Sequence, residues 1–190
     1  MSRWEPNARE RLVRAAVESF LERGYDDVTV AEITERAGLT KRTFFRHFQD
    51  KREVLFAGQD ILSGLLADAI AAAPESATPI EAISAALTAT EAAMDADRRE
   101  WAAKVQRVVA GQPDLREREL LKRAKLRGAM ASALRARGVP DPAATLAAEI
   151  GGLAFTTAFA RWVEPANERA FGELAQEALE ELVKAAGALG

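Results

Sequence analysis

The residues with the clearest chemical potential lie in one short segment, Leu39–Arg52. This segment contains five cations and one anion, a net charge of +4, whereas Glu53–Gly190 contains 15 cations and 20 anions. It opens with the run Thr40-Lys41-Arg42-Thr43. Arginine can bond guanine through two hydrogen bonds, and threonine can offer a hydroxyl or a methyl group to a base edge. A compact basic patch on a chain of net charge −3 predicts a nucleic-acid contact, although a solvated helix face has the same charge pattern.

The sequence contains few residues suited to disulfide formation, metal binding or catalysis. The chain has no cysteine, so a disulfide framework, a thiol nucleophile and a thiolate metal site are all excluded. His47 is the only histidine, and a lone histidine cannot build a metal site. A serine–histidine pair would also need His47, and the carboxylates of Glu180 and Glu181 point apart on a helix because they are neighbours in sequence. We therefore expect no enzyme activity, no metal and no cofactor.

Two short helices must position the basic segment. Thr29 and Glu32 have the spacing of a capping box at the start of the first helix, and Gly38 ends it. Thr40 caps the second helix, which we expect to reach about Phe48. Two short helices joined by a tight turn that contains glycine predict a helix-turn-helix, whose second helix lies in the major groove of DNA.

The remainder of the chain predicts an all-α fold. Apolar residues recur with helical periodicity, no alternating strand pattern is visible, and 48% of the residues are hydrophobic. We expect about nine helices, with a DNA-binding domain over residues 1–50 and a helical ligand-binding and dimerisation domain over residues 51–190. The helices with the clearest bounds are Pro6–Arg23, Lys41–Phe48, a helix from about Asp50 to Ala73, Arg98–Ala110, Leu115–Arg137 and Asp141–Val163.

The sequence also makes a prediction about location. The run Met1–Pro6 lacks the apolar stretch of a signal peptide, and no stretch of 18 residues is free of charge. We expect a cytoplasmic protein with no membrane span.

Residues 9 to 56 resemble the DNA-binding domain of the TetR family. The resemblance lies in the runs Gly24-Tyr25-Asp26-Asp27-Val28-Thr29-Val30-Ala31-Glu32-Ile33 and Ala37-Gly38-Leu39-Thr40-Lys41-Arg42-Thr43-Phe44-Phe45-Arg46-His47-Phe48, followed by Lys51. It implies a homodimeric transcriptional repressor that leaves its palindromic double-stranded DNA operator when a small molecule binds. The residues that it implies contact DNA are Thr29, Thr40, Lys41, Arg42, Thr43, Arg46, His47 and Lys51.

Roles carry over to individual positions of this segment. The resemblance implies that Thr29, His47 and Lys51 meet the phosphate backbone, and that Thr40, Arg42 and Thr43 face base edges or nearby phosphates. Thr29 and Thr40 also have a purely structural interpretation as helix caps. The family often has tyrosine at the position of Phe45, which lacks the hydroxyl for the phosphate contact of that tyrosine.

The C-terminal part predicts a dimer interface. Its longest apolar helix, from Asp141, is rich in alanine and glycine, which permit close approach of another helix, and two apolar faces imply two partners. With the helix from Phe171 it resembles the four-helix dimer interface of the TetR family. The expected interface residues are Gly151, Gly152, Phe171, Leu174, Ala178 and Leu182.

An effector pocket is expected among the helices between Asp50 and Val163. The effector would be a small apolar molecule. The segment Leu115–Leu120 faintly resembles regulators with acyl-CoA-type ligands, so an acyl-CoA-like effector is one alternative. The candidate lining residues, each of which could instead be ordinary core, are Leu62, Leu66, Leu87, Met94, Trp101, Val105, Met130, Phe155, Thr156 and Phe159. The alternative function is an effector-independent helical DNA-binding protein, either architectural or constitutive, which a solid core would favour.

Overall fold

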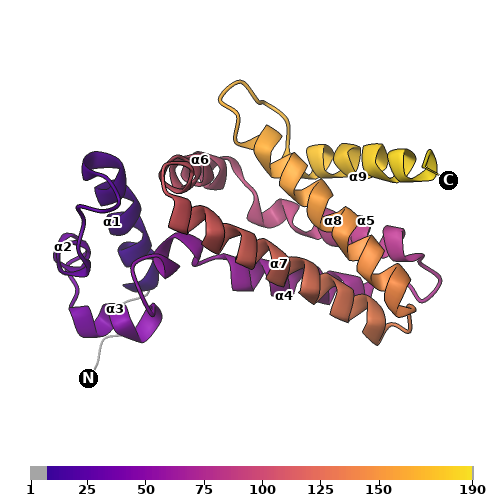
Figure 1. The fold of residues 1–190 in the computed structure, drawn as a ribbon, viewed down its shortest axis with the longest axis horizontal. Helices are drawn as coiled ribbons and strands as arrows, with labels where there is room; N and C mark the ends of the chain where they lie inside the picture. The colour runs from indigo at the N-terminus through magenta and orange to yellow at the C-terminus, as the bar shows by residue number, and fades with distance from the viewer. Residues whose placement is uncertain (1–7, 190) are drawn as a thin grey trace. The chain divides into compact units, whose positions relative to one another are not determined.

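The computed structural model describes residues 8–189, so Pro6 and Asn7 of the first predicted helix lie outside it. All regular structure in these residues is helical, which confirms the all-α prediction (Figure 1). The α-helices are α1 (Ala8–Arg23), α2 (Val30–Arg36), α3 (Lys41–His47), α4 (Gln59–Ala72), α5 (Pro79–Ala89), α6 (Ala96–Ala110), α7 (Pro113–Ala136), α8 (Asp141–Trp162) and α9 (Phe171–Gly187). Two 3₁₀ turns, η1 (Glu53–Phe56) and η2 (Glu91–Ala93), lie before α4 and α6.

The chain forms two compact units. The first comprises the described residues up to Ala57 together with Lys104–Glu119, and the second comprises Gly58–Ala103 and Leu120 onward. In the first unit, α1, α2 and α3 pack around one apolar core (Figure 1). The large side chains at its centre are Leu12, Val17, Phe20, Ile33 and Phe44.

The turn between α2 and α3 depends on a glycine. Gly38 has a φ of +62°, in the left-handed region that side chains rarely adopt, and a Cβ there would also lie 2.9 Å from Nη2 of Arg11. Arg11 donates from that atom to the carbonyl of Ala37 at 2.6 Å. The chain therefore turns sharply and places α3 directly after α2, as the helix-turn-helix prediction requires.

The fourth predicted helix differs from the structure at its start. We expected one helix from about Asp50 to Ala73, but the structure has η1, then a break, and α4 only from Gln59. The carboxylate of Asp50 does accept the backbone N–H groups of Arg52 at 2.8 Å and Glu53 at 3.0 Å. The capping interaction predicted at Asp50 is therefore present, but it begins only η1. Gly58 lies between η1 and α4, and glycine is a poor helix former, so the helix does not continue through it.

The second unit has its core among α4, α5, α7, α8 and α9. Thr78 and Glu81 form the expected capping box at the start of α5. The α8 helix packs most extensively against α9 and α5, and its buried positions are mostly alanine and glycine. At Gly151 a Cβ would lie 2.7 Å from Cγ2 of Ile83, so the close approach of α5 and α8 requires glycine there.

Two segments, Glu53–Ala72 and Asp141–Trp162, are long and apolar enough to cross a membrane by length and composition alone. Core helices of bundles pass the same test. In α8 the buried residues pack with α5 and α9, as expected of a core helix.

The end of α4 is held by one side chain from the end of α7. The guanidinium of Arg137 donates to the carbonyls of Ile70 at 3.2 Å, Ala73 at 2.6 Å and Pro74 at 2.6 Å. The carbonyls of Ile70 and Pro74 also accept the backbone N–H groups of Ala73 at 3.3 Å and Ala77 at 2.9 Å, so Arg137 adds a second bond to each of them and also bonds the carbonyl of the cap residue Ala73.

Candidate functional site

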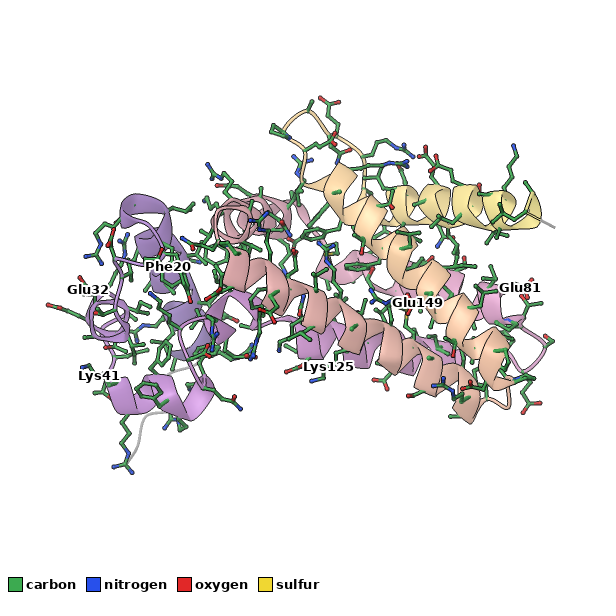
Figure 2. The ribbon with its side chains drawn as sticks, in the orientation of Figure 1. Phe20, Glu32, Lys41, Glu81, Lys125 and Glu149 are labelled. Carbon is green, nitrogen blue, oxygen red and sulfur yellow. The ribbon has the colours of Figure 1, made fainter. Side chains whose placement is uncertain are left out.

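The α3 helix presents a cationic outer face. Lys41, Arg42, Phe45 and Arg46 are exposed, and no carboxylate lies between Lys41 and His47. Figure 2 shows Lys41 projecting from the start of α3. The helix is anchored by Phe44 and Phe48 on its other side, which are both buried and lie 5.5 Å apart between ring centroids. Aromatic burial therefore fixes α3 with its cations directed outward.

Thr40 and Thr43 form a pair at the start of α3. Oγ1 of Thr40 accepts the backbone N–H of Thr43 at 3.2 Å, so Thr40 is the helix cap that the sequence predicts. The two hydroxyl oxygens lie 3.0 Å apart and share a further hydrogen bond. Both hydroxyls remain at the start of the helix beside Lys41, but each already has a partner within the chain.

Thr29 caps α2 through the predicted capping box. Its hydroxyl donates to Oε2 of Glu32 at 2.7 Å, and the same carboxylate accepts the Thr29 backbone N–H at 2.7 Å. Arg23 lies 2.6 Å from Glu32, and its hydrogen bond, followed by those from Thr29, lowers the pKa of Glu32 to about 2. A phosphate at the start of α2 would therefore meet a carboxylate that is charged at neutral pH, with Arg23 beside it.

Lys51 has a structural role that the sequence does not reveal. Its ammonium donates to the carbonyls of Tyr25 at 2.7 Å, Val28 at 3.0 Å and Asp26 at 3.4 Å. An ammonium has three N–H donors, so all of them are directed at backbone oxygens. A phosphate contact by Lys51 would have to displace one of these bonds, of which the bond to Asp26 is the longest.

His47 lies half-buried at the end of α3. Its Nε2 atom is shielded from solvent and has no hydrogen-bond partner. Burial lowers the pKa of His47, and the nearby charges of Arg46 and Arg9 lower it further. The ring is therefore neutral at physiological pH in the free protein.

Arg9 was not predicted from the sequence. Its guanidinium lies 5.7 Å from the centroid of the Phe48 ring, and it also donates to the carbonyl of Ala57. It links α1 both to the aromatic anchor of α3 and to the end of η1. No spacing pattern identifies such a contact, because its partners are 39 and 48 residues away.

Comparison with known proteins identifies this unit. The family described as "Bacterial regulatory proteins, tetR family" matches residues 12–57. The chain carries a TetR-family N-terminal domain. Its curated relatives include the TcmR regulator of Streptomyces glaucescens, 37% identical over 81 residues, and the uncharacterised regulator YdgC of Bacillus subtilis, 44% identical over 50 residues. These matches span 43% and 26% of this chain, but only 36% and 25% of the relatives' own lengths.

Solved structures extend the likeness to the whole fold. The triclosan complex of SmeT, a repressor from Stenotrophomonas maltophilia, matches with a TM-score of 0.64 and 22% identity over 93% of this chain and 90% of that chain. The TetR-family repressor FadR from Thermus thermophilus, in complex with lauroyl-CoA, matches with a TM-score of 0.57 and 24% identity over 92% and 93%. The chain therefore has a TetR-like fold, and the predicted resemblance to the family is confirmed.

The predicted pocket residues are all buried or half-buried. Leu66, Leu87 and Met130 are fully buried. Leu62, Met94, Phe155 and Phe159 are half-buried and pack against the core of the second unit, and Trp101 is half-buried. The hydroxyl of Thr156 donates to the carbonyl of Gly152 at 2.9 Å. Val105 belongs to the first unit, whereas the other predicted pocket residues belong to the second unit.

Two open grooves lie between α7 and α8. The larger, of about 350 Å³, includes Leu120, Arg127, Ile150 and Leu153 in its lining, and the smaller is about 220 Å³. Of the predicted pocket residues only Thr156 borders either groove. Figure 2 shows Glu149, which borders both grooves, on α8 beside α7.

Five of the six residues expected at the dimer interface lie within the chain's own core. Gly151, Gly152, Phe171, Leu174 and Ala178 are all buried, and only Leu182 is half-buried. Phe171, Leu174 and Ala178 belong to the apolar core of the second unit, and Gly151 allows the close approach of α5 and α8. Gly152 borders the larger groove between α7 and α8. The role of these residues in a dimer stays a prediction.

Proposed function

We propose that the protein is a DNA-binding transcriptional regulator that binds a two-fold operator as a homodimer. The observation that carries this proposal is the outer face of α3, where Lys41, Arg42 and Arg46 stand exposed without a carboxylate on the same helix. In a helix-turn-helix the second helix enters the major groove with its N-terminal residues at the base edges. That position belongs to Lys41 and Arg42, with Thr43 beside them.

A dimer follows from the small number of bases that one helix can read. Two helices related by a two-fold axis contact half-sites about 34–36 Å apart, one turn of B-DNA. We place the dimer surface on α8, where Leu146 and Leu153 are 60% and 51% exposed and Ile150 is half-buried. These residues have the spacing of one helix face, and an isologous dimer needs one such self-complementary patch.

The outer face of α9 is less suited to this role. Glu173, Glu177 and Glu181 form ion pairs there with Arg161 and Arg169. The family likeness implies an interface made by both helices, and the large apolar residues exposed near the C-terminal end of α9 are Val183, within the helix, and Leu189, just after it. We therefore assign the centre of the interface to α8 and its edge to α9.

We further propose repression that a small apolar effector relieves. Support comes from the ligand complexes of SmeT and FadR, which share the fold, and from the half-buried rings of Phe155 and Phe159, which stack 6.2 Å apart against the core. The effector must bind the released state better than the DNA-bound state, and such couplings are typically about 1–3 kcal/mol. The competing function, an effector-independent regulator, is supported by the complete burial of Leu66, Leu87 and Met130.

The DNA proposal is tested by titrating an operator selected from random DNA with matched arginine variants. Arg42→Ala should weaken binding by about 1–3 kcal/mol and relax the base preference at one position in each half-site. Arg116→Ala removes the same charge from an exposed position on α7 and should bind like the wild type. Equal affinities for wild type and Arg42→Ala would show that α3 does not read the bases.

The two modes of regulation are separated by adding triclosan or lauroyl-CoA to the protein–operator complex. Release of the operator together with a raised melting temperature of the free protein supports the effector-responsive mode. A complex that neither probe affects, with no change in melting temperature, favours the effector-independent function.

A further inference from the structure

Phe45 is an exposed aromatic side chain on a face otherwise made of cations. It is 57% exposed, and it is the one aromatic side chain in residues 8–189 that the structure leaves largely in water. Its neighbours in sequence differ sharply, since Phe44 is fully buried and Phe48 nearly so. The anchoring of α3 is therefore complete without Phe45, and packing within the chain does not account for its ring.

A contact within the chain nevertheless favours one orientation of the ring. The edge-to-face contact with Phe44 places the two ring centroids 5.4 Å apart at an angle of 79°. The backbone beneath it is fixed by the Thr40 cap and by the bond from the Phe48 N–H to the Phe44 carbonyl at 2.9 Å. A side chain that is already ordered loses little entropy when it makes a contact.

Phe45 shares its helix face with the residues that would approach the bases. It follows Lys41 by four residues and Arg42 by three, and residues at these spacings are neighbours on a helix surface. If those cations lie in the major groove, the Phe45 ring lies there as well. This step rests on the proposed DNA-binding function.

A phenyl ring has few suitable partners in the major groove. The base edges there carry hydrogen-bond donors and acceptors, and the one apolar group that they present is the C5-methyl of thymine. Phosphate oxygens gain nothing from a ring that cannot donate a hydrogen bond. We propose that Phe45 is a specificity-determining residue that recognises the methyl group of a thymine in each half-site.

The proposal is tested by removing only that methyl group. The full-length protein is used to select an operator, and each symmetry-related pair of thymines is then replaced by deoxyuridine. One pair should show weaker binding, by about threefold to fourfold for each half-site, the value for burial of one methyl group. Anisotropy titrations at a single salt concentration measure the change.

Phe45 variants assign the effect to the ring. With Phe45→Ala, the thymine and deoxyuridine operators should bind equally, while Phe45→Leu should keep part of the preference. Because Phe45 is exposed, both variants should melt like the wild type, which serves as the folding control. Selection repeated with Phe45→Ala should lose the thymine from the consensus and keep the position that Arg42 reads.

Two outcomes would overturn the inference and leave the DNA-binding function intact. In the first, no thymine pair is sensitive to loss of the methyl group. In the second, Phe45→Ala weakens the thymine and deoxyuridine operators by the same factor, which indicates a contact with sugar or phosphate. A wild-type protein that enriches no DNA sequence would instead contradict the proposed function itself.

Discussion

The ammonium of Lys51 lies 4.2 Å from the centroid of the Tyr25 ring and donates a hydrogen bond of 2.7 Å to the carbonyl of the same residue. A cation over an aromatic face is attracted by the ring quadrupole. With its bond to Val28, the lysine fixes the loop that leads from α1 to the Thr29 cap. A residue expected at the phosphate backbone thus also stabilises the loop that positions the helix-turn-helix.

Lys51→Met should therefore lower the free energy of unfolding. The change leaves backbone carbonyls without their donor, and such losses cost about 1–3 kcal/mol. Lys41→Met is the matched control, because Lys41 is exposed on α3, and it should leave stability unchanged. Urea unfolding measures both. A Lys51→Met protein that unfolds like the wild type but binds DNA with a reduced salt dependence would assign the lysine to phosphate instead.

The stability of the first unit should decrease in acid because of Glu32. Its pKa is about 2 in the folded chain against an ordinary value of 4.5, since Arg23 and Thr29 stabilise the carboxylate. Between these two pH values the unfolded chain takes up a proton that the folded chain does not, so falling pH favours unfolding. The contribution is present above about pH 4.5 and is lost as the pH falls toward 2.

Glu32→Gln tests this acid dependence. The variant cannot titrate at this position, so its stability should change less than that of the wild type between pH 4.5 and 2, as measured by thermal melts at fixed ionic strength. Identical pH profiles for the two proteins would show that the hydrogen bonds of Glu32 do not contribute in solution.

Two glycines predict opposite effects of adding one methyl group. At Gly151 a Cβ would lie 2.7 Å and 3.2 Å from atoms of Ile83, so Gly151→Ala should destabilise the fold by about 1–3 kcal/mol. Gly128 also lies within a helix, but a Cβ added there would meet no atom within 4 Å beyond its own helix backbone. Gly128→Ala should stabilise by about 0.4–1 kcal/mol, because alanine is the better helix former. Chemical denaturation of the pair should show shifts of opposite sign.

The dimer surface is tested by one charge on α8. Leu153→Glu should place carboxylates in the centre of the proposed interface and shift the protein toward monomer in sedimentation at micromolar concentration. Ile61→Glu is the control, because Ile61 is 66% exposed on a different helix, α4. A dimeric Leu153→Glu protein would place the interface elsewhere.

The sequence predicts best what depends on neighbours in the chain. The caps at Thr29, Thr40 and Thr78 follow from residues three positions away, and each is present in the structure. The basic face of α3 also follows from one short segment. The bonds of Lys51 to Tyr25 and Val28 join residues more than 20 positions apart, and no local pattern encodes them.

Composition was a weaker guide in the second unit. The small residues of α8 indicate close approach of another helix, but they do not say whether that helix belongs to the same chain. Gly151 is opposite Ile83 of α5, which lies 68 residues earlier, so the close packing is internal. The surface that remains for a partner becomes visible only when the internal contacts have been assigned.

The hydrogen bonds from Arg137 to the carbonyls of Ile70, Ala73 and Pro74 have a consequence for how the second unit opens. Helix ends ordinarily fray, and their amides then exchange hydrogen with solvent independently of the rest of the fold. Here unwinding of the final turn of α4 would also break the hydrogen bonds from Arg137, which directly follows α7. These bonds therefore oppose fraying at the end of α4 and couple it to the end of α7.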